Sequence, residues 1–102
     1  MIHDVMENFE FDKIQSVMQH LDWRWAGDGY KVPSIEQLKR TAYDLLVDAI
    51  EMAEKEMFEH DGIAYFSATG GLKAMVFKGE NNRVNLIRLE FIIEEWEQSV
   101  NE

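Results

Sequence analysis

The stretch that decides the fold is SIEQLKRTAYDLLVDAIEMAEKEMFEH, residues 34–60, which contains no Gly or Pro and is rich in helix-favouring residues. Its apolar residues recur at steps of three and four, which is the spacing of one face of a helix. We therefore expect a long amphipathic helix that supplies the core against which the rest of the chain packs. Its buried face would hold Ile35, Leu38, Ala42, Leu45, Leu46, Ala49, Ala53 and Met57.

Both ends of this helix carry recognisable signals. Ser34 can cap the first turn and Gln37, three residues later, can reach back to it in a capping box. Asp61-Gly62 offers a left-handed stop at the other end. We expect the helix to run from Ser34 to about Phe58.

Composition places the chain among globular proteins with a strongly negative surface. Its 102 residues are one domain by length, with 46% hydrophobic and 12% aromatic residues. Twenty acidic against ten basic residues give a formal charge of −10, which repels nucleic acid and anionic membranes. The chain has no Cys, its first 25 residues show no basic start followed by an apolar run, and it contains no 18 consecutive apolar residues. We expect a soluble protein of the cytoplasm, with no direct contact to nucleic acid or membrane.

The N-terminal third predicts one short helix. Residues 1–10 are polar apart from Ile2, Val5, Met6 and Phe9 and are expected to form a loosely packed lead-in. Apolar residues from Phe11 onward then follow one helix face up to about Leu21, and Asp12 with Gln15 has the spacing of a cap. Residues 22–33 predict a structured loop, with Trp23 and Trp25 extended on one side of the chain and glycines at 27 and 29.

The C-terminal third changes to residues that favour strands. Residues 63–68 and 72–78 predict two strands joined by a turn at 69–71. Residues 83–94 alternate apolar and charged side chains, which indicates a third strand, although a helix from residue 85 onward also fits the pattern. Residues 96–102 are expected to be a loose acidic tail.

These elements predict an α+β domain with two N-terminal helices packed on a C-terminal three-stranded antiparallel sheet. The long helix would cover one face of the sheet, and the domain would span residues 1–102. The pattern does not decide how the other face is covered, because its side chains mix apolar with polar. A half-apolar outer face would suit a homodimer.

Acidic side chains gather on the polar face of the long helix. Seven acids and one Lys lie between residues 44 and 61, where they oppose the helix dipole. A solvated face explains such a run, and so does a docking surface for a basic partner. In the second interpretation the partner-binding residues are Asp44, Asp48, Glu51, Glu54 and Glu59, with Trp23 and Trp25 as an apolar anchor.

No catalytic motif stands out, and the three histidines lack the spacing of a metal site. We expect neither a cofactor nor a metal, and an enzyme is the weakest hypothesis. A weak alternative is a small-ligand site in which the glycine turn presents N–H groups to an anion and aromatic rings stack on a base. Its residues would be Thr69, Gly70, Gly71, Tyr30 and Tyr65.

Four stretches in this order resemble a family of small phage and prophage proteins: residues 11–25, 32–46 (VPSIEQLKRTAYDLL), SATGGLKA and LIRLEFIIEEWE. That family has no settled activity, so the resemblance implies a context and no functional residue. It implies a non-enzymatic accessory protein that binds and modulates or inhibits a host protein with a basic surface. One such target would be a nucleic-acid-targeting defence complex, inhibited by carboxylates that imitate phosphates. The alternative remains a module that sequesters a nucleotide-like ligand.

Overall fold

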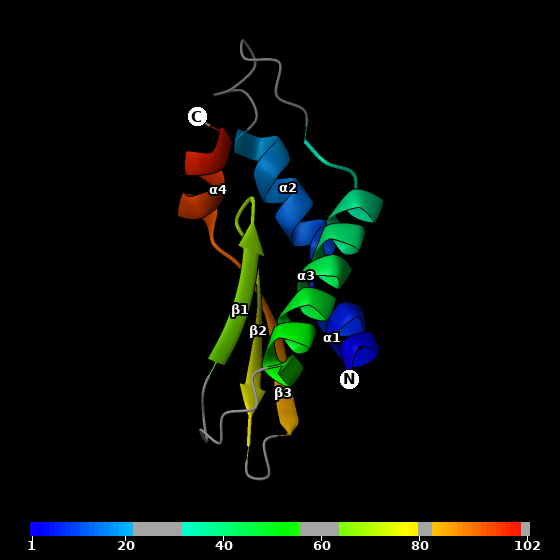
Figure 1. Cartoon of the computed structure of the whole chain (residues 1–102). Coiled ribbons are helices and arrows are strands. Elements are labelled where there is room, and N and C mark those ends of the chain that lie inside the picture. The colour runs from blue at the N-terminus through cyan, green and yellow to red at the C-terminus, as the bar shows by residue number, and fades with distance from the viewer. Residues whose placement is uncertain (22–31, 56–63, 80–82, 101–102) are drawn as a thin grey trace.

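The computed structural model describes residues 1–21, 32–55, 64–79 and 83–100 of the chain. In this part the fold is α+β, with helices and one antiparallel sheet of strand order β1-β2-β3 (Figure 1). The elements are α1 (Ile2–Asn8), α2 (Phe11–Leu21), α3 (Ile35–Lys55), β1 (Ala64–Thr69), β2 (Leu72–Lys78), β3 (Val84–Phe91) and α4 (Ile93–Val100).

Helix α3 begins as its sequence predicts. The backbone N–H of Ser34 donates to Gln37 Oε1 at 2.8 Å, and the N–H of Gln37 donates to Ser34 Oγ at 3.1 Å. This reciprocal pair satisfies two N–H groups that have no partner inside the helix. The helix is described as far as Lys55; its predicted end near Phe58 and the stop at 61–62 lie outside the described residues.

The predicted face of α3 is the one that packs against the sheet. Helix α3 contacts all three strands, and most of the predicted apolar face is buried. Small side chains in its centre let the helix axis approach the sheet closely, since Ala42, Ala49 and Ala53 are 0% exposed. The buried residues of the face are Leu38, Ala42, Leu45, Leu46, Ala49 and Ala53.

The predicted sheet is also present. Strands β1 and β2 form a hairpin in which Thr69 pairs with Leu72, and Gly70 and Gly71 make the two-residue turn with φ of +54° and +89°. Positive φ at both positions is what a type I′ hairpin needs, and glycine adopts it without a steric penalty. Strand β2 pairs antiparallel with β3, as predicted, although β3 ends at Phe91 rather than at residue 94.

Two helices occupy segments that were expected to be loose. Residues 2–8 form α1, because Ile2, Val5 and Met6 pack against the core. Residues 93–100 form α4, whose Trp96 is only 2% exposed and fixes the helix to the end of the sheet. The chain therefore uses the strand pattern up to Phe91 and the competing helical pattern after it. Instead of two N-terminal helices, the described residues contain four helices, one of which follows the sheet.

Helix α2 lies close to its predicted position but is not capped as predicted. It begins at Phe11, so Asp12 lies inside the first turn and cannot be the cap. The amide Nε2 of Gln15 instead donates to the carbonyl of Pro33 at 3.3 Å, which ties α2 to the approach to α3. Residues 22–31, which include the predicted Trp23–Trp25 segment, lie outside the described residues.

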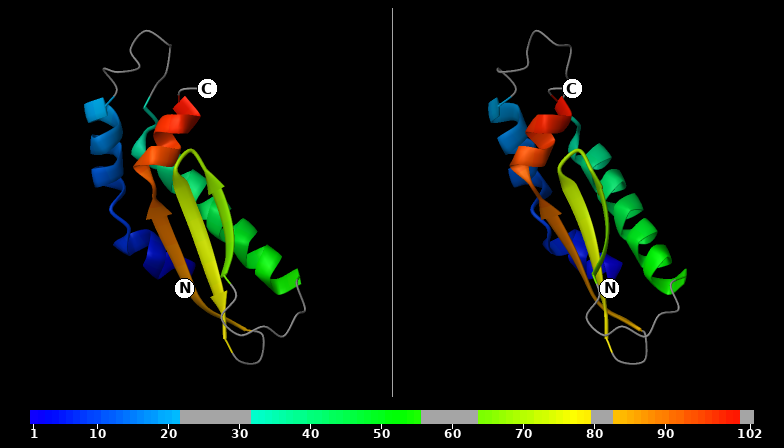
Figure 2. Two further views of the ribbon diagram at one scale, coloured as in Figure 1. Left: turned by 90° about the vertical axis from the view of Figure 1, so that its left-hand side faces the viewer. Right: turned by 60° about the vertical axis from the view of Figure 1, so that its left-hand side comes forward.

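The arrangement leaves the two faces of the sheet in different surroundings. Helix α3 covers one face, which we call the inner face, and α1 packs against α3 and β3. Figure 2 (left) shows the three strands side by side with α3 behind them and α4 across the end of the sheet near the β1–β2 turn. None of the described helices lies across the middle of the other face, which we call the outer face.

Candidate functional site

The acidic face of α3 is defined by Asp44, Asp48 and Glu51, which are all exposed. They lie at steps of four and three residues, so they share one stripe of the helix and rise about 6 Å and 4.5 Å along it. The opposite side of the helix is the buried one that faces the sheet. The three carboxylates are therefore presented outward by a helix that is held firmly in place.

The remaining acids of the predicted set do not extend this stripe. Glu54 is exposed but lies on the flank of α3 that faces α1, where it lines a hollow of about 720 Å³ together with Tyr43 and Ile50. Glu59, Trp23 and Trp25 lie outside the described residues. The structure thus brings together three of the seven predicted partner-binding residues.

Asp48 has a partner that the sequence did not indicate. The hydroxyl of Ser67 on β1 donates to Asp48 Oδ2 at 3.0 Å, which joins the acidic face to the edge strand of the sheet. The described ion pairs are elsewhere, between His3 and Glu7 and between Lys13 and Glu10. Among the described residues, no cation forms an ion pair with the three carboxylates of the acidic face. Their negative charges are therefore not neutralised locally and together produce a negative potential over this face.

The glycine turn of the alternative ligand site is part of a packed hairpin. A side chain added at Gly71 would lie 2.6 Å from Cβ of Trp96 and 3.0 Å from the carbonyl of Ile92, whose N–H donates to the Gly71 carbonyl at 2.8 Å. Gly70 is open, since an added Cβ there meets no atom within 4 Å. One side of the turn is thus covered by the start of α4 and the other is free.

The aromatic residues of that alternative are not beside the turn in the described part of the chain. Tyr65 lies on β1 four residues before Thr69, which is about 13 Å along a strand. Tyr30 lies outside the described residues. The ligand site therefore stays a prediction. Its glycine turn is formed, and the described aromatic residues beside the turn are Phe91 and Trp96, which are not those of the predicted site.

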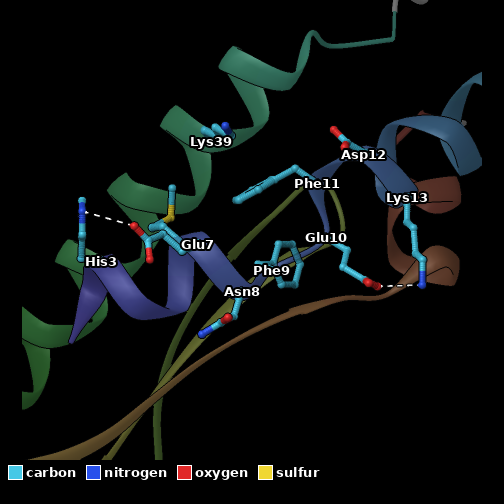
Figure 3. A pocket seen from close by; sticks show the side chains of 10 residues that line it. His3, Glu7, Asn8, Phe9, Glu10, Phe11, Asp12, Lys13 and Lys39 are labelled. Carbon is cyan, nitrogen blue, oxygen red and sulfur yellow. Dashed lines mark ion pairs between the residues drawn. The ribbon is translucent and has the colours of Figure 1, made fainter.

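A hollow of about 640 Å³ lies between α1, α2 and α3 (Figure 3). Four of its charged side chains form local surface pairs: His3 Nε2 lies 3.7 Å from Glu7 Oε1, and Lys13 Nζ lies 2.9 Å from Glu10 Oε2. These four side chains are at least 65% exposed, so the pairs are solvated and contribute little to stability. The hollow could not have been predicted, because it needs the helix α1 that the sequence did not indicate. Its lining is His3, Met6, Glu7, Asn8, Phe9, Glu10, Phe11, Asp12, Lys13 and Lys39.

The outer face of the sheet is the second surface that sequence reasoning could not resolve. The strand register places Phe66, Met75 and Arg88 in one row across it, because Phe66 pairs with Met75 and Met75 with Arg88. Phe66 is 58% exposed, although Lys73 Nζ lies 4.8 Å from its ring centroid. The described residues of this face are Phe66, Ala68, Lys73, Met75, Phe77, Leu86, Arg88 and Glu90.

Other kinds of site find no support in the described part of the chain. No group of three or more His, Asp or Glu side chains there is placed to hold a metal ion. Both described histidines, His3 and His20, are exposed. Among the described helices, none is both long and apolar enough to cross a membrane. Comparison of the chain with protein-family models, with curated proteins and with solved structures gave no match.

Proposed function

We propose that the protein is a small, acidic, non-enzymatic binding protein that attaches to a host protein with a basic surface and modulates or inhibits it. The observation that supports this proposal best is the acidic face of α3. Asp44, Asp48 and Glu51 point outward from a helix whose opposite side is buried against the sheet. Charges that are already fixed lose little conformational entropy when a partner binds, whereas charges on a mobile segment must first be ordered.

The proposed target is a host complex that acts on nucleic acid, with the carboxylates standing in for phosphates. A net charge of −10 on 102 residues repels nucleic acid itself but favours the surfaces that bind nucleic acid. The resemblance to small phage proteins motivates this choice of target, and we propose the cytoplasm of the host cell as the location. We propose Glu54, Glu59, Trp23 and Trp25 as further contact residues, the two indoles supplying the apolar anchor.

Capture from host lysate tests the proposal. Wild type and the variant Asp44→Lys, Asp48→Lys, Glu51→Lys would each be immobilised, and the bound proteins identified by mass spectrometry. We expect basic proteins with nucleic-acid-binding surfaces on wild type and their loss on the variant. The control variant Asp4→Lys, Glu7→Lys, Glu94→Lys makes the same change in net charge at exposed positions elsewhere and should retain the partner. Equal capture by all three proteins would contradict the role of the acidic face.

The ligand-binding alternative makes a different prediction in the same experiment. A nucleotide held at Thr69–Gly71 would not depend on the charge of α3, and its affinity would change little with salt. If wild type captures no basic partner, and calorimetry shows equal nucleotide binding by wild type and the acidic-face variant, this alternative would move to first place.

We also propose that the protein associates with itself. The domain leaves large apolar side chains exposed, among them Phe66, Leu86 and Met52 at 58%, 48% and 43%. The first two lie on the same face of the sheet. Clustered apolar groups that stay in contact with water are a usual feature of surfaces that bind another protein.

A further inference from the structure

The outer face of the sheet differs in charge from the chain as a whole. Among the described residues, Glu90 is the only acid on it, whereas two cations, Lys73 and Arg88, lie on it. Two copies of a chain with a charge of −10 repel each other in most orientations. The outer face is a surface through which they can meet without opposing clusters of carboxylates.

Charged and apolar side chains occupy opposite ends of this face. Near the β1–β2 turn the row is Ala68, Lys73 and Glu90, which holds both signs of charge. At the other end Phe77 pairs with Leu86, which is 48% exposed. The face is therefore polarised along the strands, with one charged end and one apolar end.

We propose that the outer faces of two copies pack against each other around a two-fold axis that runs parallel to the strands. This inference rests on the proposed self-association and names its surface. An axis along the strands puts apolar end on apolar end and charged end on charged end. An axis across the strands would instead press Lys73 and Glu90 against Phe77 and Leu86 of the second copy, which buries both charges against apolar side chains with no new partner from that copy.

The same axis pairs β1 of one copy with β3 of the other, and the side chains there are complementary. Ala68 faces Glu90 of the second copy, and because its side chain is small, this carboxylate can reach Lys73 of the first copy. Lys73 and Glu90 of the two copies together form a neutral group of two cations and two acids. Arg88 faces the ring of Phe66 of the second copy, where a guanidinium binds favourably. The two Lys73 side chains oppose each other at the axis on the central strand, and each has Glu90 of its own copy as cross-strand neighbour and Glu90 of the second copy within reach.

The size of the face sets the expected affinity. Three strands about 4.8 Å apart with six residues rising about 3.3 Å each give a face of roughly 15 by 20 Å. That is small beside the roughly 800 Å² that each partner buries in a stable interface, so we expect a dimer that forms in the micromolar range and dissociates on dilution.

Sedimentation equilibrium of the full chain from about 5 to 500 µM tests the inference. Wild type should rise from 12.0 kDa toward twice that mass. Phe66→Glu and Leu86→Glu each replace an exposed side chain and should raise the dissociation constant at least tenfold, with circular dichroism as a check that each is folded. Tyr43→Glu and Met52→Glu, at comparably exposed positions on α3, should leave it unchanged.

A charge exchange tests the direction of the axis. Lys73→Glu alone and Glu90→Lys alone place like charges around the axis, so each variant should be monomeric. An equimolar mixture should form a heterodimer, because the two acids at positions 73 and 90 of one copy then face the two lysines at positions 73 and 90 of the other. A mixture that stays monomeric would contradict the axis along the strands.

The outcomes separate the inference from the proposal beneath it. Wild type that remains at 12.0 kDa at the highest concentration would overturn both. If Leu86→Glu dimerises as well as wild type, the outer face is not the interface, but the protein still associates with itself. Pairing along the edge of β1 would then be the remaining arrangement, since Leu86 lies on the opposite edge strand, β3.

Discussion

Ser67 Oγ donates a hydrogen bond to Asp48 Oδ2 at 3.0 Å, and this bond connects the acidic face of α3 to the edge strand β1. Asp48 therefore has a structural contact as well as a proposed role in binding. Its two neighbours on the stripe, Asp44 and Glu51, have no such contact among the described residues. Substitutions of Asp44 and Glu51 are therefore expected to weaken binding without changing stability. A substitution of Asp48 is expected to change both.

The first prediction concerns this bond. Ser67→Ala should lower the free energy of unfolding by roughly 0.5–1.5 kcal/mol, because a hydrogen bond at a surface contributes that much. Asp48→Asn should cost less, since an amide oxygen can still accept from the hydroxyl. Urea unfolding measures both, and Asp44→Asn is the control. Equal stability of Ser67→Ala and wild type would show that the bond contributes nothing.

The second prediction tests which face of α3 is buried. Ala49 is 0% exposed against the sheet, so Ala49→Asp buries an unpaired carboxylate and should cost several kcal/mol. Met52→Asp makes the same kind of change at a side chain that is 43% exposed and should change stability little. Thermal unfolding compares the two. An Ala49→Asp variant that melts with wild type would overturn the orientation of α3.

The third prediction concerns the start of α3. Ser34→Ala removes the acceptor of the Gln37 N–H and should cost roughly 1 kcal/mol. Gln37→Ala removes only the return bond to the Ser34 N–H, which is exposed, and should cost less. Lys39→Ala, in the same helix and without a role in the cap, serves as the control. The order of the three melting temperatures is the readout.

The fourth prediction distinguishes the two glycines of the β1–β2 turn. Both have positive φ, so an alanine at either costs roughly 1–2 kcal/mol of backbone strain. At Gly71 the added Cβ also meets Cβ of Trp96 and the Ile92 carbonyl, so α4 must shift. Gly71→Ala should therefore be the less stable variant, by roughly 1–3 kcal/mol. Similar stabilities would mean that α4 does not pack on the turn.

Local signals were enough to predict α3 and the β1–β2 hairpin. Ser34 with Gln37 marks the start of α3, and the glycine pair marks the β1–β2 hairpin. Helices α1 and α4 have seven and eight residues, which is too short for a helix to be stable alone, so they depend on tertiary contacts. Residues 96–102 were predicted to be a loose tail, although Trp96 also fits the competing helical pattern. Its burial depends on contacts with Gly71 and Phe91.

The candidate surfaces were predictable to different extents. Helical periodicity alone predicts that Asp44, Asp48 and Glu51 are exposed on one stripe. The Ser67–Asp48 bond joins residues 19 apart in sequence, and no local pattern signals it. The outer face depends on strand register, because a shift of one residue would exchange Phe66 and Ser67 between the two faces.

Association kinetics at low salt test whether the acidic face of α3 attracts the host partner. The captured host partner would be immobilised, and the association rate measured for wild type, the Asp44→Lys, Asp48→Lys, Glu51→Lys variant and the charge-matched control. We expect the acidic-face variant to bind at least tenfold more weakly, mainly through slower association, with the wild-type rate falling as salt rises. The control should resemble wild type. If the acidic-face variant associates as fast as wild type at low salt, the acidic face does not bind the partner and is only a solvated surface of α3.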